Sequence, residues 1–164
     1  MGMVTGTQEL IDAHQGRLFR VALAICGDPH TAEEAVADAV ARCWPALSRS
    51  GIDDPGAYLR RAVVNVLHGR FRQLAVERRA RERRNGDGRG NLDAAADMAA
   101  RDAVLRALRE LSERQRAVVV LRFYEGLSEA EIAAELGIPA GTVKSTAARA
   151  SARLRMLLED DRHD

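Results

Sequence analysis

The sequence predicts an all-α protein made of two small helical domains joined by a flexible linker. Of its 164 residues, 46% are apolar but only 4% are aromatic, a balance that favours helices packed through small and aliphatic side chains over a β-sandwich. Apolar residues recur at three- and four-residue spacing through most of the chain, without strand-like alternation. A Gly- and Asp-rich stretch, residues 85–97, interrupts this periodicity. We therefore predict a first domain at residues 1–80, a linker at 81–100 and a second domain at 101–164.

The first domain is predicted to begin with two helices, residues 7–25 and 31–47, separated by a Gly-Asp-Pro turn. Thr31 followed by Glu34 resembles a capping box at the start of the second helix. Pro45 is poorly placed in a helix interior, so we expect this helix to end or bend just before it. The face opposite the apolar residues carries an acidic stripe with one arginine: Glu33, Glu34, Asp38 and Arg42.

A third, arginine-rich helix is predicted from Ala57, after a loop of turn-forming residues. Its apolar positions are expected to face inward: Leu59, Ala62, Val63, Val66, Leu67, Phe71 and Leu74. Its sides and outer face carry the polar residues Arg60, Arg61, Asn65, His68, Arg70 and Arg72.

Charge is unevenly distributed between these elements. Residues 1–59 hold eight acids against four arginines, whereas residues 60–90 hold ten arginines against three acids. This asymmetry indicates two partners of opposite charge, of which nucleic acid is the natural partner of the basic segment. The alternative is a solvated arginine-rich helix produced by coding bias in a GC-rich genome, because Lys144 is the single lysine of the chain.

The second domain is predicted to contain a series of short helices. Residues 104–111 form one amphipathic helix, and residues 113–125 follow with Ser112 and Gln115 as a capping box. Ser128 and Glu131 form a second capping box at the start of the next helix.

Residues 131–150, EIAAELGIPAGTVKSTAARA, have the pattern of a helix-turn-helix unit. Such a unit needs a small residue where its helices cross, supplied by Ala133, and a turn residue that tolerates positive φ, supplied by Gly137. The second helix is expected to start near Pro139 with Thr142 as its N-cap. Apolar residues that fix the angle between the helices are Ile132, Leu136, Ile138 and Val143. The alternative is an ordinary antiparallel helix pair with solvated basic residues.

Both halves resemble the bacterial sigma factor family. LSERQRAVVVLRFYE followed by GLSEAEIAAELGIPAGTVKS resembles region 4 of that family, while GDPHTAEEAVADAVARCW and DPGAYLRRAVVNVLHGRFR resemble region 2. The resemblance covers about residues 8–75 and 101–157. Short chains with these two domains alone form the extracytoplasmic-function (ECF) group, group IV of the sigma-70 family. This sequence is most similar to the actinobacterial SigE-like branch.

The resemblance implies an RNA polymerase sigma factor, which binds core polymerase and directs promoter-specific transcription initiation without being an enzyme and without a cofactor. The acidic helix would bind the β′ coiled coil of the polymerase core through Glu34, Asp38 and Arg42. The arginine-rich helix would recognise the −10 element through Arg60, Arg61, Asn65, Arg70 and Arg72. The helix-turn-helix would recognise the −35 element and touch the β flap, with Thr142, Lys144, Ser145, Arg149 and Arg153 as its DNA contacts. An anti-sigma factor is a further partner common in the family.

Three positions depart from the family pattern. Ala37 stands where Gln is usual in the acidic helix, which implies weaker or differently distributed core binding. Tyr58 replaces the usual Trp, and Gly69 stands where Asp is common; a glycine inside a helix costs about 1 kcal/mol relative to Ala. Asn65 is also consistent with an ordinary amide on a helix surface.

Other classes of protein are less well supported. A stand-alone dimeric helix-turn-helix regulator is the principal alternative, but it does not need an acidic docking helix beside a basic one. Catalysis lacks a clustered set of titratable residues, since the histidines His14, His30, His68 and His163 are scattered. Cys26 and Cys43 have no Cys-x-x-Cys spacing, which predicts buried structural thiols and no metal site. No secretion signal or apolar run of roughly 18–20 residues is present, which predicts a cytoplasmic protein with no membrane insertion.

Overall fold

The computed structural model describes residues 2–49, 51–82 and 99–160, and the regular structure within these ranges is helical. The prediction of an all-α protein is therefore confirmed. The elements, in chain order, are α1 (Gly2–Cys26), α2 (Pro29–Leu47), α3 (Pro55–Glu82), α4 (Ala99–Arg109), α5 (Glu113–Val119), the π-helical turn η1 (Val120–Tyr124), α6 (Glu129–Leu136) and α7 (Ala140–Asp160). Residues 83–98, which make up most of the predicted linker, lie outside the described residues.

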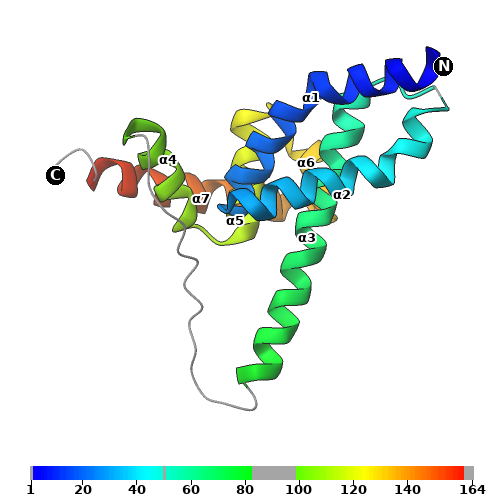
Figure 1. Ribbon diagram of the computed structural model, residues 1–164. Coiled ribbons are helices and arrows are strands. Elements are labelled where there is room, and N and C mark those ends of the chain that lie inside the picture. Colours follow the sequence, from blue (N-terminus) through cyan, green and yellow to red (C-terminus); the bar gives the residue numbers. More distant parts are fainter. Residues whose placement is uncertain (1, 50, 83–98, 161–164) are drawn as a thin grey trace.

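The first half of the chain packs α1, α2 and α3 against one another (Figure 1). Its core is aliphatic, and the largest of its fully buried side chains are Val21, Ile25, Leu59, Val63 and Leu67. These residues recur at helical spacing, as the sequence predicts. Leu74 is an exception, because it is 57% exposed. The prediction that Leu74 faces inward is wrong because α3 continues beyond the other helices, so that no other described helix covers its last turns (Figure 1).

The start of α2 differs from expectation, and its end lies beyond Pro45. The helix begins at Pro29, and Asp28 is its N-cap, with the carboxylate accepting a hydrogen bond from the Thr31 amide. The capping box predicted for Thr31 and Glu34 is therefore wrong: Thr31 donates to the cap instead of being the cap. The helix also continues through Pro45 to Leu47. A proline in the last turn of a helix removes one amide donor without ending the helix at that point.

The second half follows its predicted caps closely. Both capping boxes are confirmed, at Ser112 with Gln115 and at Ser128 with Glu131. The π-helical turn at the end of α5 was not predicted; there the Glu125 amide donates to the Val120 carbonyl at 3.1 Å. A π-helical turn contains an extra residue, which changes the direction of the side chains that follow it.

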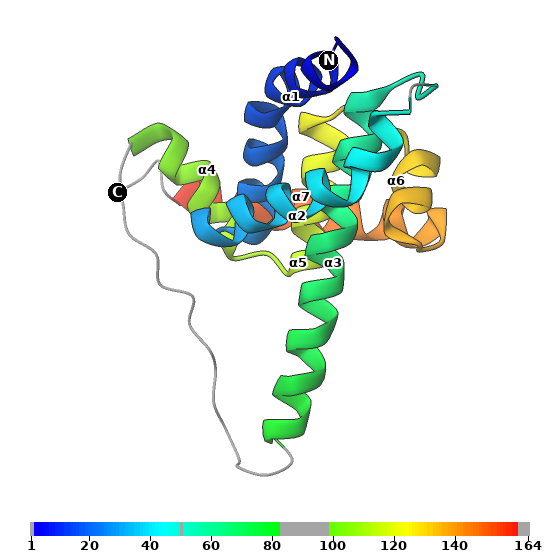
Figure 2. The same ribbon diagram turned by 45° about the vertical axis from the view of Figure 1, so that its right-hand side comes forward.

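The two halves pack against each other. Helix α1 contacts α4, α5 and η1, while α3 contacts α6, and Figures 1 and 2 show α5 and α6 beside the helices of the first half. One continuous core joins residues from both halves, including Val63 and Leu67 with Val118, Leu121 and Ile132. The halves therefore share one buried apolar core.

Candidate nucleic-acid interface

The helix-turn-helix is formed by α6, the turn at Gly137 and α7. Gly137 has φ = 63°, in the left-handed region that favours glycine, and the Ile138 amide closes the turn by donating to the Ala133 carbonyl at 3.1 Å. Ile132 and Val143 are fully buried between the helices. The turn glycine and the apolar positions thus have the roles that the sequence predicts.

The start of α7 differs from expectation. The helix begins at Ala140, and the Thr142 amide already donates to the Pro139 carbonyl at 2.9 Å. The prediction of Thr142 as N-cap is wrong, because Thr142 lies inside the first turn. An N-terminal position on a recognition helix still suits a side chain that meets a phosphate.

The predicted −35 contacts lie mostly on the solvent face of α7. Lys144, Ser145, Arg149 and Arg153 are exposed, and Thr142 is half-buried. Ser145 Oγ donates to the Thr142 carbonyl, and Arg149 Nε donates to the Ser145 carbonyl. These bonds remain within the helix and leave the outer face available to another molecule. The neighbouring small residues Thr146 and Ala147 are buried and serve helix packing.

The predicted −10 contacts on α3 are in more varied surroundings. Asn65 and Arg72 are exposed. Arg70 Nη1 donates to Glu34 Oε2 on α2 at 2.7 Å. The Arg61 side chain is exposed, and its Nη2 donates to the Ala134 carbonyl on α6 at 3.4 Å. The side chain of Arg60 is only 14% exposed, so it faces the second half of the molecule and not solvent.

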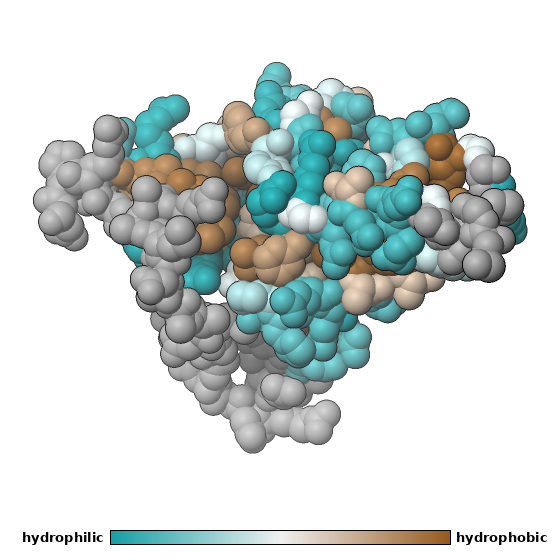
Figure 3. Space-filling view, turned by 45° about the horizontal axis from the view of Figure 1, so that its top comes forward, coloured by the Kyte–Doolittle hydropathy of each residue, from teal (hydrophilic) through white to brown (hydrophobic). Residues whose placement is uncertain are grey.

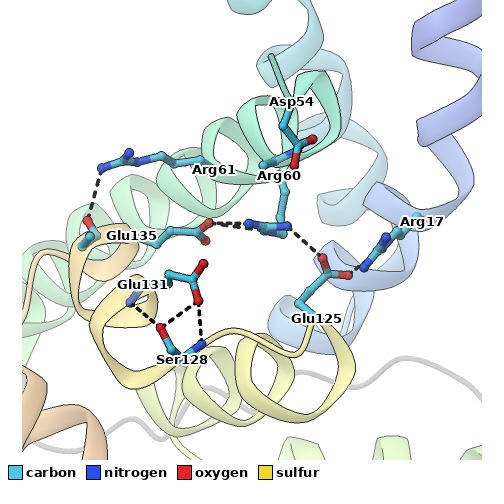
Figure 4. A network of polar contacts seen from close by, with 10 residues as sticks. Arg17, Asp54, Arg60, Arg61, Glu125, Ser128, Glu131 and Glu135 are labelled. Atoms are coloured by element: carbon cyan, nitrogen blue, oxygen red, sulfur yellow. Dashed lines mark hydrogen bonds and ion pairs between the residues drawn. The ribbon is translucent and has the colours of Figure 1, made fainter. Parts of the chain in front are cut away.

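Arg60 is the centre of a set of ion pairs between the two halves, which we call the interdomain network: Arg17, Arg60, Glu125 and Glu135 (Figure 4). Arg60 Nη2 lies 2.9 Å from Glu135 Oε1, and Arg60 Nη1 lies 3.2 Å from Glu125 Oε2. Arg17 Nε lies 2.9 Å from Glu125 Oε1. The two carboxylates hold the pKa of the Arg60 guanidinium above its ordinary value, although burial opposes that shift.

The predicted core-binding residues share one helix face. Glu34 pairs with Arg70 and also lies 3.3 Å from His30 Nε2, while Asp38 pairs with Arg42 at 3.0 Å. All of these ion pairs include substantially exposed side chains. Exposed ion pairs contribute about 0–1 kcal/mol each, so a basic partner could replace them at little cost.

Three further groups have shifted pKa values because of burial. Burial raises the pKa of the Cys26 and Cys43 thiols, so both stay protonated, in agreement with the prediction of buried structural thiols. The pKa of His68 is lowered by burial and by the positive charges of Arg72 and Arg114. His68 is therefore more readily neutral at the edge of the apolar cleft that it lines.

The face seen in Figure 3 is mainly hydrophilic, with separate apolar patches. Large exposed apolar side chains come from several helices: Tyr58, Leu74, Val76, Val104, Phe123, Tyr124 and Met156. Over the described ranges, no helix is long and apolar enough to cross a membrane. The same residues contain no group of three or more His, Cys, Asp or Glu side chains suited to a metal ion.

An exposed helix-turn-helix beside a separate arginine-rich helix defines a DNA-binding protein with two distinct basic elements. Comparisons with known proteins agree. The family model described as "Sigma-70 region 2" matches residues 10–77, and "Sigma-70, region 4" matches residues 101–154. The chain is 37% identical over 161 residues to the RNA polymerase sigma-E factor of Streptomyces antibioticus, covering 96% of this chain and 87% of that relative.

A second relative is the ECF RNA polymerase sigma factor SigL of Mycobacterium tuberculosis, 32% identical over 160 residues, covering 92% of this chain and 88% of the relative. The fold is similar to that of the sigma factor RpoE from Bartonella quintana, solved with the anti-sigma factor NepR. That similarity has a TM-score of 0.72 at 25% identity, and covers 93% of this chain and 96% of the other. The chain belongs to the sigma-70 family, in the SigE-like branch of its ECF group.

Sequence reasoning did not single out the acidic members of the interdomain network. Glu125 lies in the turn after η1 and Glu135 lies near the end of α6. Both occupy ordinary polar positions of an amphipathic pattern, where an acidic side chain is normally solvated. Their burial depends on packing between the two halves, for which a helical pattern has no signal.

Proposed function

We propose that this chain is a promoter-specificity subunit of RNA polymerase, which binds the core enzyme and directs initiation at promoters with particular −10 and −35 elements. The observation that carries the proposal is the presence of region 2 and region 4 in one chain, at residues 10–77 and 101–154. A stand-alone dimeric regulator needs only the helix-turn-helix, so it leaves the first half without a role. Such a subunit acts in the cytoplasm and is not itself an enzyme.

The two halves have separate roles in this proposal. The acidic face of α2, with Glu34, Asp38 and Arg42, docks on the β′ coiled coil of the core. Helix α3 neutralises phosphates and contacts the unpaired −10 strand through Arg60, Arg61, Asn65, Arg70 and Arg72, contributions that weaken with salt. Helix α7 enters the major groove at the −35 element through Thr142, Lys144, Ser145, Arg149 and Arg153, and region 4 also contacts the β flap.

An anti-sigma factor is proposed as a further partner. The support is that the similar RpoE chain was solved in complex with an anti-sigma factor. The exposed apolar side chains on several helices of this chain provide surface that a protein partner could cover.

Run-off transcription with core polymerase and a promoter library tests the proposal. We expect the purified chain to stimulate initiation from a subset of promoters. If it never stimulates initiation but shifts duplex DNA alone, the stand-alone regulator is the better description.

Two variants distinguish residues that bind promoter DNA from residues that bind core polymerase. Lys144→Ala should weaken promoter use by about 1 kcal/mol or more while core association is retained. Arg155→Ala removes an exposed cation about three turns further along α7 and is the matched control. Asp38→Arg should lower core affinity through charge reversal, with Asp53→Arg in an exposed loop as control. Unchanged core affinity in Asp38→Arg would remove the docking role.

A further inference from the structure

A cleft beside α3 is not explained by the proposed roles in DNA and core binding. Its volume is about 170 Å³, and it is lined by residues of α1, α3, α5 and the helix-turn-helix. An apolar protein cavity of about 150 Å³ can hold a benzene molecule. The cleft is therefore large enough for a ring or a chain of about six carbon atoms.

The interior of the cleft is apolar. Its walls include Leu67 and Phe71 on α3, Ala117 on α5, Leu136 at the end of α6 and Ile138 in the turn that follows. Phe71 and Ile138 are only half-buried. Such walls offer water few hydrogen bonds, so an apolar group that replaces water there is favoured by the hydrophobic effect.

Basic side chains from two helices meet beside this apolar interior. His68 and Arg72 on α3 and Arg114 on α5 all line the cleft. The positive charges of Arg72 and Arg114 both lower the pKa of His68, which indicates that the two guanidinium groups lie close to one imidazole. These three residues form the basic edge of the cleft.

The basic edge has an excess of positive charge. Within the described part of the chain, neither Arg72 nor Arg114 forms an ion pair with an acid. Glu113 is an acid that also lines the cleft, and its negative charge raises the pKa of Arg116. Two guanidinium groups beside one carboxylate leave a net positive charge, which favours an anionic ligand over a cationic or neutral one.

We propose that the cleft binds a small organic carboxylate, whose apolar body of about six carbon atoms fills the interior while its carboxylate pairs with Arg72 and Arg114 at the basic edge. A guanidinium offers a carboxylate parallel N–H donors in a planar fork. A phosphate monoester would need more hydration at its head group than an edge next to apolar walls provides. The chain would thus have a small-molecule site in addition to its proposed macromolecular partners, and this site does not depend on the proposed function.

Hexanoate is a suitable probe, with hexanol and hexylamine as comparison ligands of the same carbon number. In two-dimensional amide NMR of the full chain, we expect saturable shifts at Leu67, Phe71 and Ile138 when hexanoate is added. Burial of its short chain predicts a dissociation constant of about 1 mM. Hexylamine should bind at least about tenfold more weakly, because its charge repels the basic edge. Equal binding of the three ligands, or no shifts at the cleft residues, would overturn the proposal.

Arg114→Glu tests the basic edge without altering a proposed DNA contact. Arg114 is exposed, so the substitution should not unfold the chain. We expect hexanoate to bind about tenfold more weakly to this variant, while hexanol binds as it does to the wild type. Arg114→Lys keeps the charge and should lose less affinity.

Arg155→Glu is the matched control for the change in net charge. Arg155 is exposed on α7 and does not line the cleft. This variant should bind hexanoate with the affinity of the wild type. If Arg114→Glu also binds hexanoate with the affinity of the wild type, the carboxylate does not pair at the basic edge and the proposal is wrong.

The titration of His68 locates the carboxylate of the ligand. A bound anion beside His68 should raise its pKa, since it offsets the positive charges of Arg72 and Arg114. Hexanoate should therefore bind more tightly as pH falls through the pKa of His68, with Glu113 opposing part of this effect. NMR titration of the imidazole with and without hexanoate measures the shift.

His30 on α2 does not line the cleft, and its titration curve should be the same with and without hexanoate. Equal curves for His68 under the two conditions would overturn the placement of the carboxylate. These measurements use the chain without polymerase or DNA. Failure to bind hexanoate is therefore distinguishable from failure to stimulate initiation in run-off transcription.

Discussion

Helices α7 and α3 both present cations with a proposed role in promoter recognition, yet their surroundings differ. On α7, Lys144 and Arg149 are exposed and lie on a helix set by local signals, the Ser128 cap and the Gly137 turn. On α3, Arg60 is fixed by acids more than 60 residues away in sequence. The surroundings of α7 therefore follow from its neighbours in sequence, whereas those of Arg60 follow from tertiary packing.

The largest expected effect comes from removing the buried cation. Arg60→Ala leaves Glu135 buried without its ion-pair partner and Glu125 with Arg17 alone, and should lower the free energy of unfolding by about 3 kcal/mol. Lys144→Ala removes an exposed cation and should change it by less than about 0.5 kcal/mol. Urea unfolding of the two variants measures both changes in the free energy of unfolding. Equal changes would contradict the difference in surroundings between Arg60 on α3 and Lys144 on α7.

The turn of the helix-turn-helix should be the next most sensitive position. Gly137→Ala places a side chain at φ = 63°, which costs about 1–2 kcal/mol in an L residue. No atom lies within 4 Å of the added Cβ, so the cost is conformational and not steric. Gly141→Ala is the control, because it lies in the first turn of α7 with ordinary φ and open space, and should be neutral or slightly stabilising.

The cap that starts α6 should have an effect that depends on pH. Hydrogen bonds from the Ser128 backbone and side chain lower the pKa of Glu131. A carboxyl group with a lowered pKa in the folded state contributes stability above its unfolded-state pKa, and this contribution is lost as pH falls through its folded-state pKa. In Ser128→Ala, the N-cap bond is lost at a cost of about 1 kcal/mol, and the pKa of Glu131 should return toward its ordinary value.

An NMR titration of the Glu131 carboxyl in the wild type and in Ser128→Ala checks this assignment. Glu129 lies two residues away on the same helix but pairs with Arg122, so its titration in the two proteins is the internal control. The backbone amide of residue 128 can still donate to Glu131 in this variant, so an unchanged Glu131 midpoint would show that the Ser128 hydroxyl does not contribute to the shift.

Most of the helical architecture could be predicted because its signals are local. Two capping boxes, the glycine turn and the 3.6-residue periodicity of the apolar positions each fix a few neighbouring residues. Two of the errors also have local causes: Asp28, and not Thr31, is the N-cap of α2, and α7 begins before Thr142. By contrast, the environment of Arg60 could not be predicted, because Glu125 and Glu135 reach it only when the halves pack together.

Helix α3 offers the smallest effect, at the position where the sequence departs from its family. Gly69 is exposed inside α3, and an added Cβ would have no atom within 4 Å. Gly69→Ala should therefore stabilise the protein by about 0.5–1 kcal/mol, since alanine has the lower entropy cost in a helix. Gly56→Ala, in the first turn of the same helix, is the contrasting variant. Its added Cβ would lie 2.8 Å from His14 Cε1, so this substitution should be destabilising. The thermal unfolding midpoints of both variants test this expectation. A lower midpoint for Gly69→Ala would indicate that the projecting part of α3 requires a backbone conformation that glycine adopts more readily than alanine.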